Sequence, residues 1–473
     1  MKKVATKIMF RLIYQLLSLL TPIITIPIVS NVLGPAGIGE YKYLASIVSY
    51  FLLFAGLGLG IYGNRTIAIA RDDRQKLSQS FWEIELSSIL VSSLALIAYL
   101  IFGLATHQGG YYYIFSISFI STLLDISWLY AGLEDFGLIT IVNIFVKLAL
   151  VASTVLLIHK PSDLGWYFVI QTIQGLLSSL SLWLFVKKHV DFVPIKLKHI
   201  FKHFKGSAKF FTAQVAGTLY GAIPINLLGF FTSLTVVGYY SNAGSILGIV
   251  TAVVMVIDYV LLPRMTSGVE KHGKDYLVKN IEKTIHTQLF LIIGIMFALF
   301  SVYAHTVPWF FGIKFSVINH YMPFLIPIVL IQSLSSSVLN QYLIPLNYTK
   351  IYNLSIIAGV IVSFVVNLSL IPLLGIWGAI VAWPLCELIV MSIRVRYLLK
   401  TSIFKFNLKL LTLLLLLGGI SALIVFIFTH SMRPVFLTTG IQGGLFVALY
   451  FVLTYLCKVN LIWNILVGNG EKR

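Results

Sequence analysis

Two side chains of opposite charge lie within consecutive apolar segments of this chain. Asp125 precedes the polar break GLED at residues 132–135, and Lys147 follows it. A charge at the middle of a bilayer costs about 2.5–3.5 kcal/mol on insertion scales, so such residues mark functional sites by default. If both segments are helices, the two residues differ in depth by about 7 Å, which a flexible lysine can largely span. Two interpretations stay open: a buried ion pair, or a lysine that faces the path of an anionic substrate or a proton.

Two further acids lie in apolar segments. Glu387 is near the middle of WPLCELIV, and either faces a substrate path or is buried with a partner. Asp258 lies about one turn from the end of its segment, where it can reach water, so we expect a structural role. Arg11 and Arg65 lie near the predicted cytoplasmic ends of their segments, where they could capture an anion.

Motifs for other chemistry are missing from the sequence. There is no Walker motif and no HExxH, and no Ser/His/Asp set lies in the predicted outer hairpins, so we predict that the protein is not an enzyme. His199 and His203 have the i, i+4 spacing of metal ligands, but no Glu or Cys ligand lies beside them, so no metal site is predicted. No cofactor is expected, and coupling to a cation such as H⁺ or Na⁺ is left open.

The composition is that of a membrane protein. The 473 residues are 58% hydrophobic and 11% charged, against about 25% charged in soluble domains. Apolar runs of about 20 residues are long enough to cross a bilayer as helices, whereas a barrel would show alternating polarity. The net charge of +18 fits basic cytoplasmic loops and membrane lipids as partners, and we predict no nucleic-acid binding.

The apolar runs predict an all-α protein with about fourteen membrane spans. The predicted spans are residues 9–33, 41–62, 81–104, 111–131, 136–158, 165–186, 208–231, 236–262, 285–310, 321–345, 352–373, 376–398, 408–429 and 435–457. With the N-terminus in the cytoplasm, most of the 34 Lys and Arg lie in inside segments, and the outside hairpins hold Lys42, Lys160, Lys314 and Arg433. This asymmetry predicts that both termini are cytoplasmic.

An internal repeat divides the predicted bundle. Residues 37–49 and 236–248 share Gly, Tyr, Ser and Ile at matching positions, at the start of the second helix of each half. Parallel repeats of this kind form two lobes that rock about a substrate path, although Gly-Tyr is also common wherever a helix enters a membrane. We predict an N-lobe at 1–186, a linker at 187–207, a C-lobe at 208–399, and two further helices with a cytoplasmic tail at 400–473.

The linker at 187–207 predicts a surface helix. Leu197, Ile200, Phe201 and Phe204 form an apolar stripe, and Lys196, Lys198, His199, Lys202, His203 and Lys205 cover the other face. Such a basic amphipathic helix is expected to lie on anionic lipid at the cytoplasmic surface.

Several stretches together resemble the bacterial lipid-linked oligosaccharide flippases of the multidrug/oligosaccharidyl-lipid/polysaccharide exporter superfamily. They are NVLGPAGIGEY (31–41), YGNRTIAIARDDRQKLSQSFWEI (62–84), DISWLYAGLEDFGLITIVNIFVK (125–147), VGYYSNAGSI (237–246), LLPRMTS (261–267), NQYLIPLNYTKIYN (340–353) and VVNLSLIPLLGIWGAIVAWPLCE (365–387). The resemblance implies a MATE-like fold with two pseudo-symmetric six-helix lobes around a central cavity, plus two C-terminal helices.

The resemblance also implies a function. A protein of this family would move undecaprenyl-pyrophosphate-linked oligosaccharide units from the inner to the outer leaflet of the bacterial cell membrane by alternating access, for capsule, O-antigen or exopolysaccharide synthesis. Polymerase and glycosyltransferases of the same pathway would be its partners. The residues at matching motif positions are Arg65, Asp125, Glu134, Asn143, Lys147, Asn340, Gln341, Asn367 and Glu387. Relatives often carry a charge where this chain has Asn226, which puts a contact of that helix with an anion or a coupling ion in doubt.

Two other functions fit parts of this sequence pattern. A cation-coupled exporter of small molecules or drugs would have the same fold and is the alternative. A polysaccharide polymerase or ligase would need a long catalytic loop on the outside, and the predicted outer hairpins are short.

Overall fold

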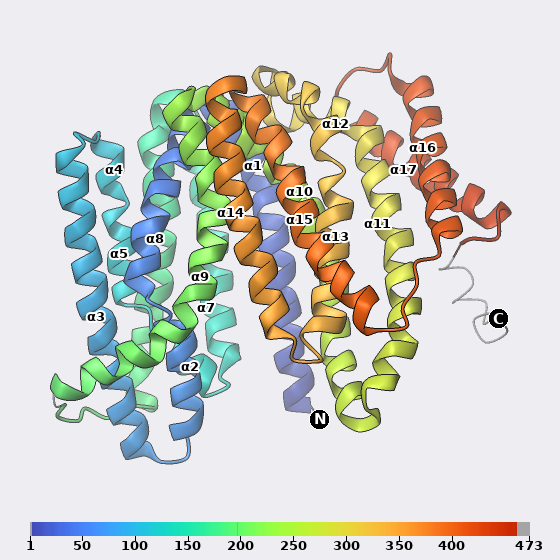
Figure 1. Ribbon diagram of the computed structural model, residues 1–473. Helices are drawn as coiled ribbons and strands as arrows, with labels where there is room; N and C mark the ends of the chain where they lie inside the picture. The colour runs from blue at the N-terminus through green and yellow to red at the C-terminus, as the bar shows by residue number, and fades with distance from the viewer. Residues whose placement is uncertain (1, 196, 461–473) are drawn as a thin grey trace. The chain divides into compact units, whose positions relative to one another are not determined.

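A computed structural model describes residues 2–195 and 197–460, and this part of the chain is helical (Figure 1). It divides into two compact units, Met1–Gly229 and Phe230–Arg473, and each is described by itself.

The described residues of the first unit form nine α-helices, the last of which crosses the boundary at Gly229. They are α1 (Lys2–Gly56), α2 (Leu59–Ala70), α3 (Arg74–Ala105), α4 (Gly110–Ile114), α5 (Ser116–Leu123), α6 (Ser127–Gly132), α7 (Phe136–Leu157), α8 (Leu164–Trp183) and α9 (Leu197–Phe231), with short 3₁₀ turns at Pro161–Asp163 and Val186–Lys188. Inside α1, Gly34 has a φ of 69° and a ψ of −178°. Only glycine adopts that conformation readily, and Pro35 follows it without an N–H, so two helices meet here at a kink.

The second unit contains α10 (Leu234–His272), α11 (Lys274–Phe311), a 3₁₀ segment η3 (Ile313–His320), α12 (Met322–Leu325), α13 (Ile328–Val338), a π-helical segment η4 (Leu339–Leu343), α14 (Thr349–Leu374), α15 (Ile376–Thr401), α16 (Leu408–Thr429) and α17 (Phe436–Leu456). Gly375 between α14 and α15 has a φ of 56°, which allows the sharp turn of that hairpin.

The described residues contain 13 helical segments that are long and apolar enough to cross a membrane. The first of them, Leu20–Ala70, has 51 residues and includes the kink at Gly34. About 20 residues suffice for one crossing, so this segment corresponds to the first two predicted spans. The predicted all-helical, multi-span architecture is confirmed.

The core of the first unit lies where α2, α3, α6 and α8 meet. Phe81, Trp128 and Tyr130 are buried there. A Cβ added at Gly63 would lie 2.7 Å from the Trp128 ring, so α2 and α6 can pack this closely only because residue 63 has no side chain. This packing fixes α6, and with it the chain segment that carries Asp125.

The start of α9 differs from the predicted surface helix. His203, expected on the solvated face, is 4% exposed, whereas Phe201, on the apolar stripe expected to face lipid, is 64% exposed. His203 lies between Tyr62, whose hydroxyl is 2.9 Å from Nδ1, and Glu83, whose Oε2 is 3.0 Å from Nε2. The face assignment was wrong for His203 because a buried acid on α3 provides its imidazole with a partner. The side chains of residues 196–200 and 205 lie outside the described part.

Candidate functional site

Asp125 lies at a break in the helical path rather than inside a continuous helix. The predicted span 111–131 is divided into α4, α5 and α6, and α5 ends at Leu123 while α6 begins at Ser127. The Asp125 Oδ1 atom accepts a hydrogen bond of 2.9 Å from the backbone N–H of Ser127. The carboxylate therefore binds one of the N–H groups at the start of α6 that have no partner within the helix.

The break frees backbone carbonyl groups, and neighbouring side chains bind them. The indole of Trp128 donates to the carbonyl of Asp125 at 2.9 Å, and the indole of Trp183 donates to that of Leu124 at 2.8 Å. One turn earlier, the Ser179 hydroxyl donates to the carbonyl of Ser121 at 3.0 Å. Irregular backbone at membrane depth is tolerated only with such partners, so α8 and α6 hold the break in place.

Lys147, on α7, is directed toward α1. Its Nζ donates a hydrogen bond of 2.6 Å to the Ser18 hydroxyl. Among the described residues no ion pair joins Lys147 to Asp125. The structure therefore gives no support to the buried pair, and the other interpretation, a lysine facing a substrate path, stays a prediction. The part of α1 that it reaches contains Pro22 and Pro27, which remove backbone hydrogen bonds and favour bending.

Two predicted asparagines connect helices inside the first unit. The Asn143 Oδ1 atom accepts from the Ser178 hydroxyl at 2.7 Å, which links α7 to α8. Asn226, on α9, accepts from the Ser46 hydroxyl at 2.9 Å and donates to the Tyr50 hydroxyl at 2.8 Å. The neutral residue at position 226 thus has two partners on α1, which explains how it can stand where a charge was expected.

Arginines lie at the rim of the first unit. Arg65 is exposed on α2, and the side chain of Arg11 lies outside the described part. Arg71 pairs with Glu134 at 2.8 Å. The GLED turn, which has no basic residue of its own, therefore obtains one from the segment after α2.

In the second unit, polar side chains converge on a fully buried acid, Asp258 of α10. Its Oδ1 accepts from the Gln288 amide at 2.8 Å and from the Gln341 amide at 3.0 Å, and its Oδ2 accepts from the Ser336 hydroxyl at 2.7 Å. Asn340 donates to Ser336 Oγ at 3.1 Å. Gln341 and Asn340 were predicted from motifs; Asp258 is buried rather than in reach of water, and its structural role stays a prediction.

Glu387 and Asn367 lie on the α14–α15 hairpin. The Glu387 Oε1 atom accepts from the Gln332 amide at 2.7 Å, and Asn367 donates to the Ser363 carbonyl at 2.7 Å. Glu387 is therefore buried and has a neutral partner on α13, and its role in a substrate path stays a prediction.

Of two buried acids on α3, Glu83 and Glu85, the second was not considered as a candidate site residue. The signal was present, because two carboxyl groups stand in the otherwise apolar run WEIEL at 82–86. Glu83 is bound by His203 and by Gln79. Glu85 is fully buried, and neither of its carboxylate oxygens has a hydrogen-bond partner.

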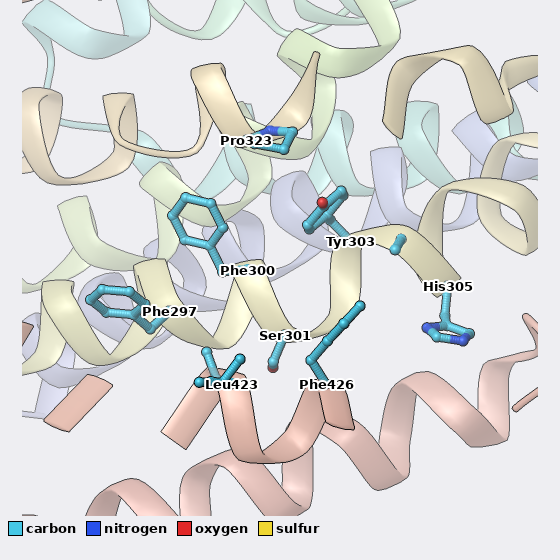
Figure 2. Close-up of a pocket in the computed structure, with 10 residues that line it drawn as sticks. Phe297, Phe300, Ser301, Tyr303, His305, Pro323, Leu423 and Phe426 are labelled. Atoms are coloured by element: carbon cyan, nitrogen blue, oxygen red, sulfur yellow. The ribbon is translucent and has the colours of Figure 1, made fainter. Parts of the chain in front are cut away.

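A cavity of about 280 Å³ opens among α11, α12 and α16 in the second unit (Figure 2). Phe297, Phe300 and Phe426 line it together with Tyr303 and His305. The amide Nε2 of Gln442, on α17, is hydrogen-bonded to Nδ1 of His305 at 3.0 Å. None of the predicted site residues lines this cavity, which is mostly apolar.

Comparison with solved structures identifies the fold. "Lipid II flippase MurJ, inward closed conformation" matches with a TM-score of 0.77 and 14% identity over 97% of this chain and 100% of the other. A multidrug resistance MATE family transporter of the MOP superfamily, in an inward-facing conformation, matches with a TM-score of 0.60 and 14% identity over 82% of this chain and 96% of the other. At these identities the likeness shows the fold alone.

Sequence comparison identifies the family. A protein of Escherichia coli (strain K12) named "Putative O-antigen transporter" is 23% identical over 386 residues, which cover 80% of this chain and 92% of that protein. The family model described as "Polysaccharide biosynthesis protein" matches residues 4–269, more than half of the chain. The chain therefore belongs to the polysaccharide biosynthesis protein family, as a multi-pass membrane transporter with a MurJ- and MATE-like fold and not an enzyme.

Proposed function

We propose that the protein moves undecaprenyl-pyrophosphate-linked oligosaccharide units from the inner to the outer leaflet of a bacterial cytoplasmic membrane, by alternating access. The observation that carries this proposal is Lys147, an intramembrane ammonium group held by Ser18 on a proline-bearing helix. A diphosphate needs cationic partners on its way through a membrane. Family membership and the name of the E. coli relative support the substrate class.

The distribution of charge supports the direction of transport. The basic residues that connect the predicted spans gather on one side, which supports a cytoplasmic position for both termini. The exposed Arg65 of α2 stands near that side, where it would meet the diphosphate before Lys147 does. The glycosyltransferases that build the unit would act before this step, and a polymerase would consume the product afterwards.

Reconstitution into liposomes with a lipid-linked oligosaccharide tests the proposal. A membrane-impermeant lectin measures how fast the sugar becomes accessible on the opposite leaflet. Lys147→Ala is expected to lower the initial rate about 10- to 100-fold, the equivalent of one lost charge-assisted hydrogen bond. Lys147→Arg should retain most of the rate because it keeps the charge.

The control is Lys314→Ala, which removes an exposed lysine from the η3 segment and should leave the rate unchanged. Equal rates for wild type and Lys147→Ala, at equal amounts of folded protein, would refute the role of Lys147. If the wild type moves no lipid-linked sugar but exports small cationic drugs, the alternative holds. That alternative, a cation-coupled exporter, is suggested by the fold shared with a multidrug transporter.

A further inference from the structure

Lys42 lies inside the helix α1 and not in the outside hairpin where the charge pattern placed it. It is eight residues beyond the kink at Gly34, about 12 Å along the helix. Its side chain is partly buried, and it belongs to the apolar segment Leu20–Ala70, which is long enough to cross a membrane. An ionisable side chain in such a segment is costly and marks a functional site by default.

No described acid neutralises Lys42. Within the described residues no hydrogen bond or ion pair involves its Nζ atom, which lies 6.0 Å from the centroid of the Tyr41 ring, at the limit of a cation–π contact. Glu40 is two residues away and therefore faces another side of the helix. Asp163, on the 3₁₀ turn that packs against α1, already accepts two backbone N–H groups. The ammonium group is thus available to an anion that is not part of the protein.

The face of α1 that carries Lys42 is polar for two further turns. Ser46 and Tyr50 follow Lys42 at i+4 and i+8, which places the three side chains on one side of the helix. Asn226 of α9 binds both of the hydroxyl groups: its Oδ1 accepts from Ser46 at 2.9 Å, and its amide donates to Tyr50 at 2.8 Å. The polar face of α1 therefore lies against α9.

The packing of α9 shows how deep Lys42 lies. A Cβ added at Gly229 would overlap the ring of Tyr43, so residue 229 packs directly against α1 only because it has no side chain. Gly229 is two residues before the end of α9 at Phe231. Since Lys42 precedes Tyr43, it lies beside the last turn of α9, which is on the outer side of the membrane in the predicted orientation.

We propose that Lys42 is the cationic group of a phosphate-binding site between α1 and the last turns of α9, which receives the diphosphate of the lipid-linked oligosaccharide on the outer side. An ammonium group binds phosphate oxygens through charge-assisted hydrogen bonds. The hydroxyl and amide groups beside Lys42 keep this part of α1 polar. The inference rests on the proposed function for the identity of the substrate.

Lys42 extends a series of cations at successive depths of the first unit. Arg65 is exposed on α2. Lys147 lies on α7, ten residues before the end of that helix at Leu157, which is about 15 Å along its axis. A diphosphate that leaves Lys147 toward the outer side would meet the ammonium group of Lys42 before it reaches water.

Binding of farnesyl pyrophosphate, an isoprenyl diphosphate that dissolves in water, tests the site directly. The probe should stabilise the full-length protein against heat, and Lys42→Ala should raise its apparent Kd about 10-fold, the equivalent of one lost charge-assisted hydrogen bond. Lys42→Arg should bind as the wild type does, whereas Lys42→Gln, which loses the charge, should bind as weakly as Lys42→Ala. Because Lys147 also attracts a diphosphate, the same loss should be seen when Lys42→Ala is added to Lys147→Ala.

Lys160→Ala is the matched control, because it removes an exposed lysine from the turn before α8 and should leave the Kd unchanged. No stabilisation of the wild type, or an equal Kd for wild type and Lys42→Ala in both backgrounds, would overturn the proposal. Phospholipid headgroups also carry phosphate, so phosphatidylglycerol is titrated in the same assay. If Lys42→Ala weakens stabilisation by phosphatidylglycerol but not by farnesyl pyrophosphate, Lys42 binds the membrane surface and the proposal is wrong.

The flipping assay separates this inference from the proposed function. Lys42→Ala should lower the initial rate about 10-fold, and Lys42→Arg should retain most of it. A wild type that flips lipid-linked sugar together with an equally active Lys42→Ala would refute the site and leave the proposed function intact. A wild type that flips no lipid-linked sugar would refute the proposed function, while a Kd for farnesyl pyrophosphate that depends on Lys42 would still support the phosphate site.

Discussion

The fourth predicted helix is interrupted in each half of the chain. The two halves differ in whether a buried acid receives hydrogen-bond donors. In the first unit, residues 110–132 form α4, α5 and α6. In the second, residues 322–343 form α12, α13 and the π-helical η4. Interrupted spans at corresponding positions of two repeats are the best pointer to a binding site in transporters.

The donors at the two interruptions serve different acceptors. In the first unit, Trp183 and Ser179 bind neutral backbone carbonyls, and the buried acid Glu85 on α3 has no donor among the described residues. In the second unit, Ser336 and Gln341 bind the carboxylate of Asp258. A π-helical turn changes which side chains face a neighbouring helix, and here Gln341 lies within that turn.

This difference separates two uses of a buried acid. A carboxyl group with three donors is satisfied as an anion and holds helices together. A buried carboxyl group with no donor is favoured in its neutral, protonated form. The first should be sensitive to any loss of side-chain atoms, and the second should tolerate a neutral isostere.

The largest expected effect is that of Asp258→Ala. It leaves the amides of Gln288 and Gln341 and the hydroxyl of Ser336 without their shared acceptor. At about 1–3 kcal/mol for each unsatisfied buried donor, the free energy of unfolding should fall by about 3 kcal/mol or more. Thermal unfolding in detergent, followed by the loss of monodisperse protein, measures the change.

Glu85→Gln is the counterpart in the first unit. Because Glu85 accepts no hydrogen bond, the same measurement should show a change of less than about 1 kcal/mol. If Glu85→Gln is destabilised as much as Asp258→Ala, the distinction between the two acids is wrong.

A matched pair of serine substitutions should show a smaller difference of the same kind. Ser336→Ala removes a hydrogen bond to a carboxylate, and Ser179→Ala removes one to a neutral carbonyl. Hydrogen bonds to charged groups contribute about 1.5–3 kcal/mol and neutral ones about 0.5–1.5 kcal/mol. Ser336→Ala should therefore be the less stable variant in the same thermal assay. The reverse order would mean that Asp258 does not carry a negative charge in the folded protein.

The architecture was predictable because membrane spans are defined by length and hydropathy. The sequence NVLGPAG also contains a signal for the kink at Gly34, because glycine directly precedes proline there. The break at Asp125 could not be predicted in this way, since residues 116–131 contain neither Gly nor Pro and form one largely apolar run. An aspartate that binds the N–H of Ser127 ends the helix locally. Whether a side chain replaces a helical hydrogen bond in this way depends on the tertiary partners of the carbonyl groups that are freed, and the sequence does not show these partners.

The partners of the charged residues could be predicted only where the relative depth and rotation of the neighbouring helices could be predicted. The depth argument placed Asp125 and Lys147 within reach of each other, but it assumed a straight helix, and the break directs the carboxylate to its own backbone. Glu83 and Glu85 are two residues apart, so they face opposite sides of α3. The sequence alone could not say which of them would bind His203 and which would be buried without a donor.

The smallest expected effect concerns Asp191, an exposed acid whose pair with Arg74 is surrounded by water. Arg74 donates two hydrogen bonds to Asp191, at 2.6 and 2.8 Å, and both side chains are exposed. The guanidinium lowers the pKa of Asp191 below its ordinary value. The contact therefore contributes fully above the ordinary range of about 4 and is lost as the pH falls through the lowered pKa. Arg74→Gln should reduce the unfolding temperature slightly at neutral pH, and the difference from wild type should vanish in acid. A difference as large as that for Ser336→Ala, or one that persists below the lowered pKa, would show that Arg74 stabilises α3 through packing rather than through its charge.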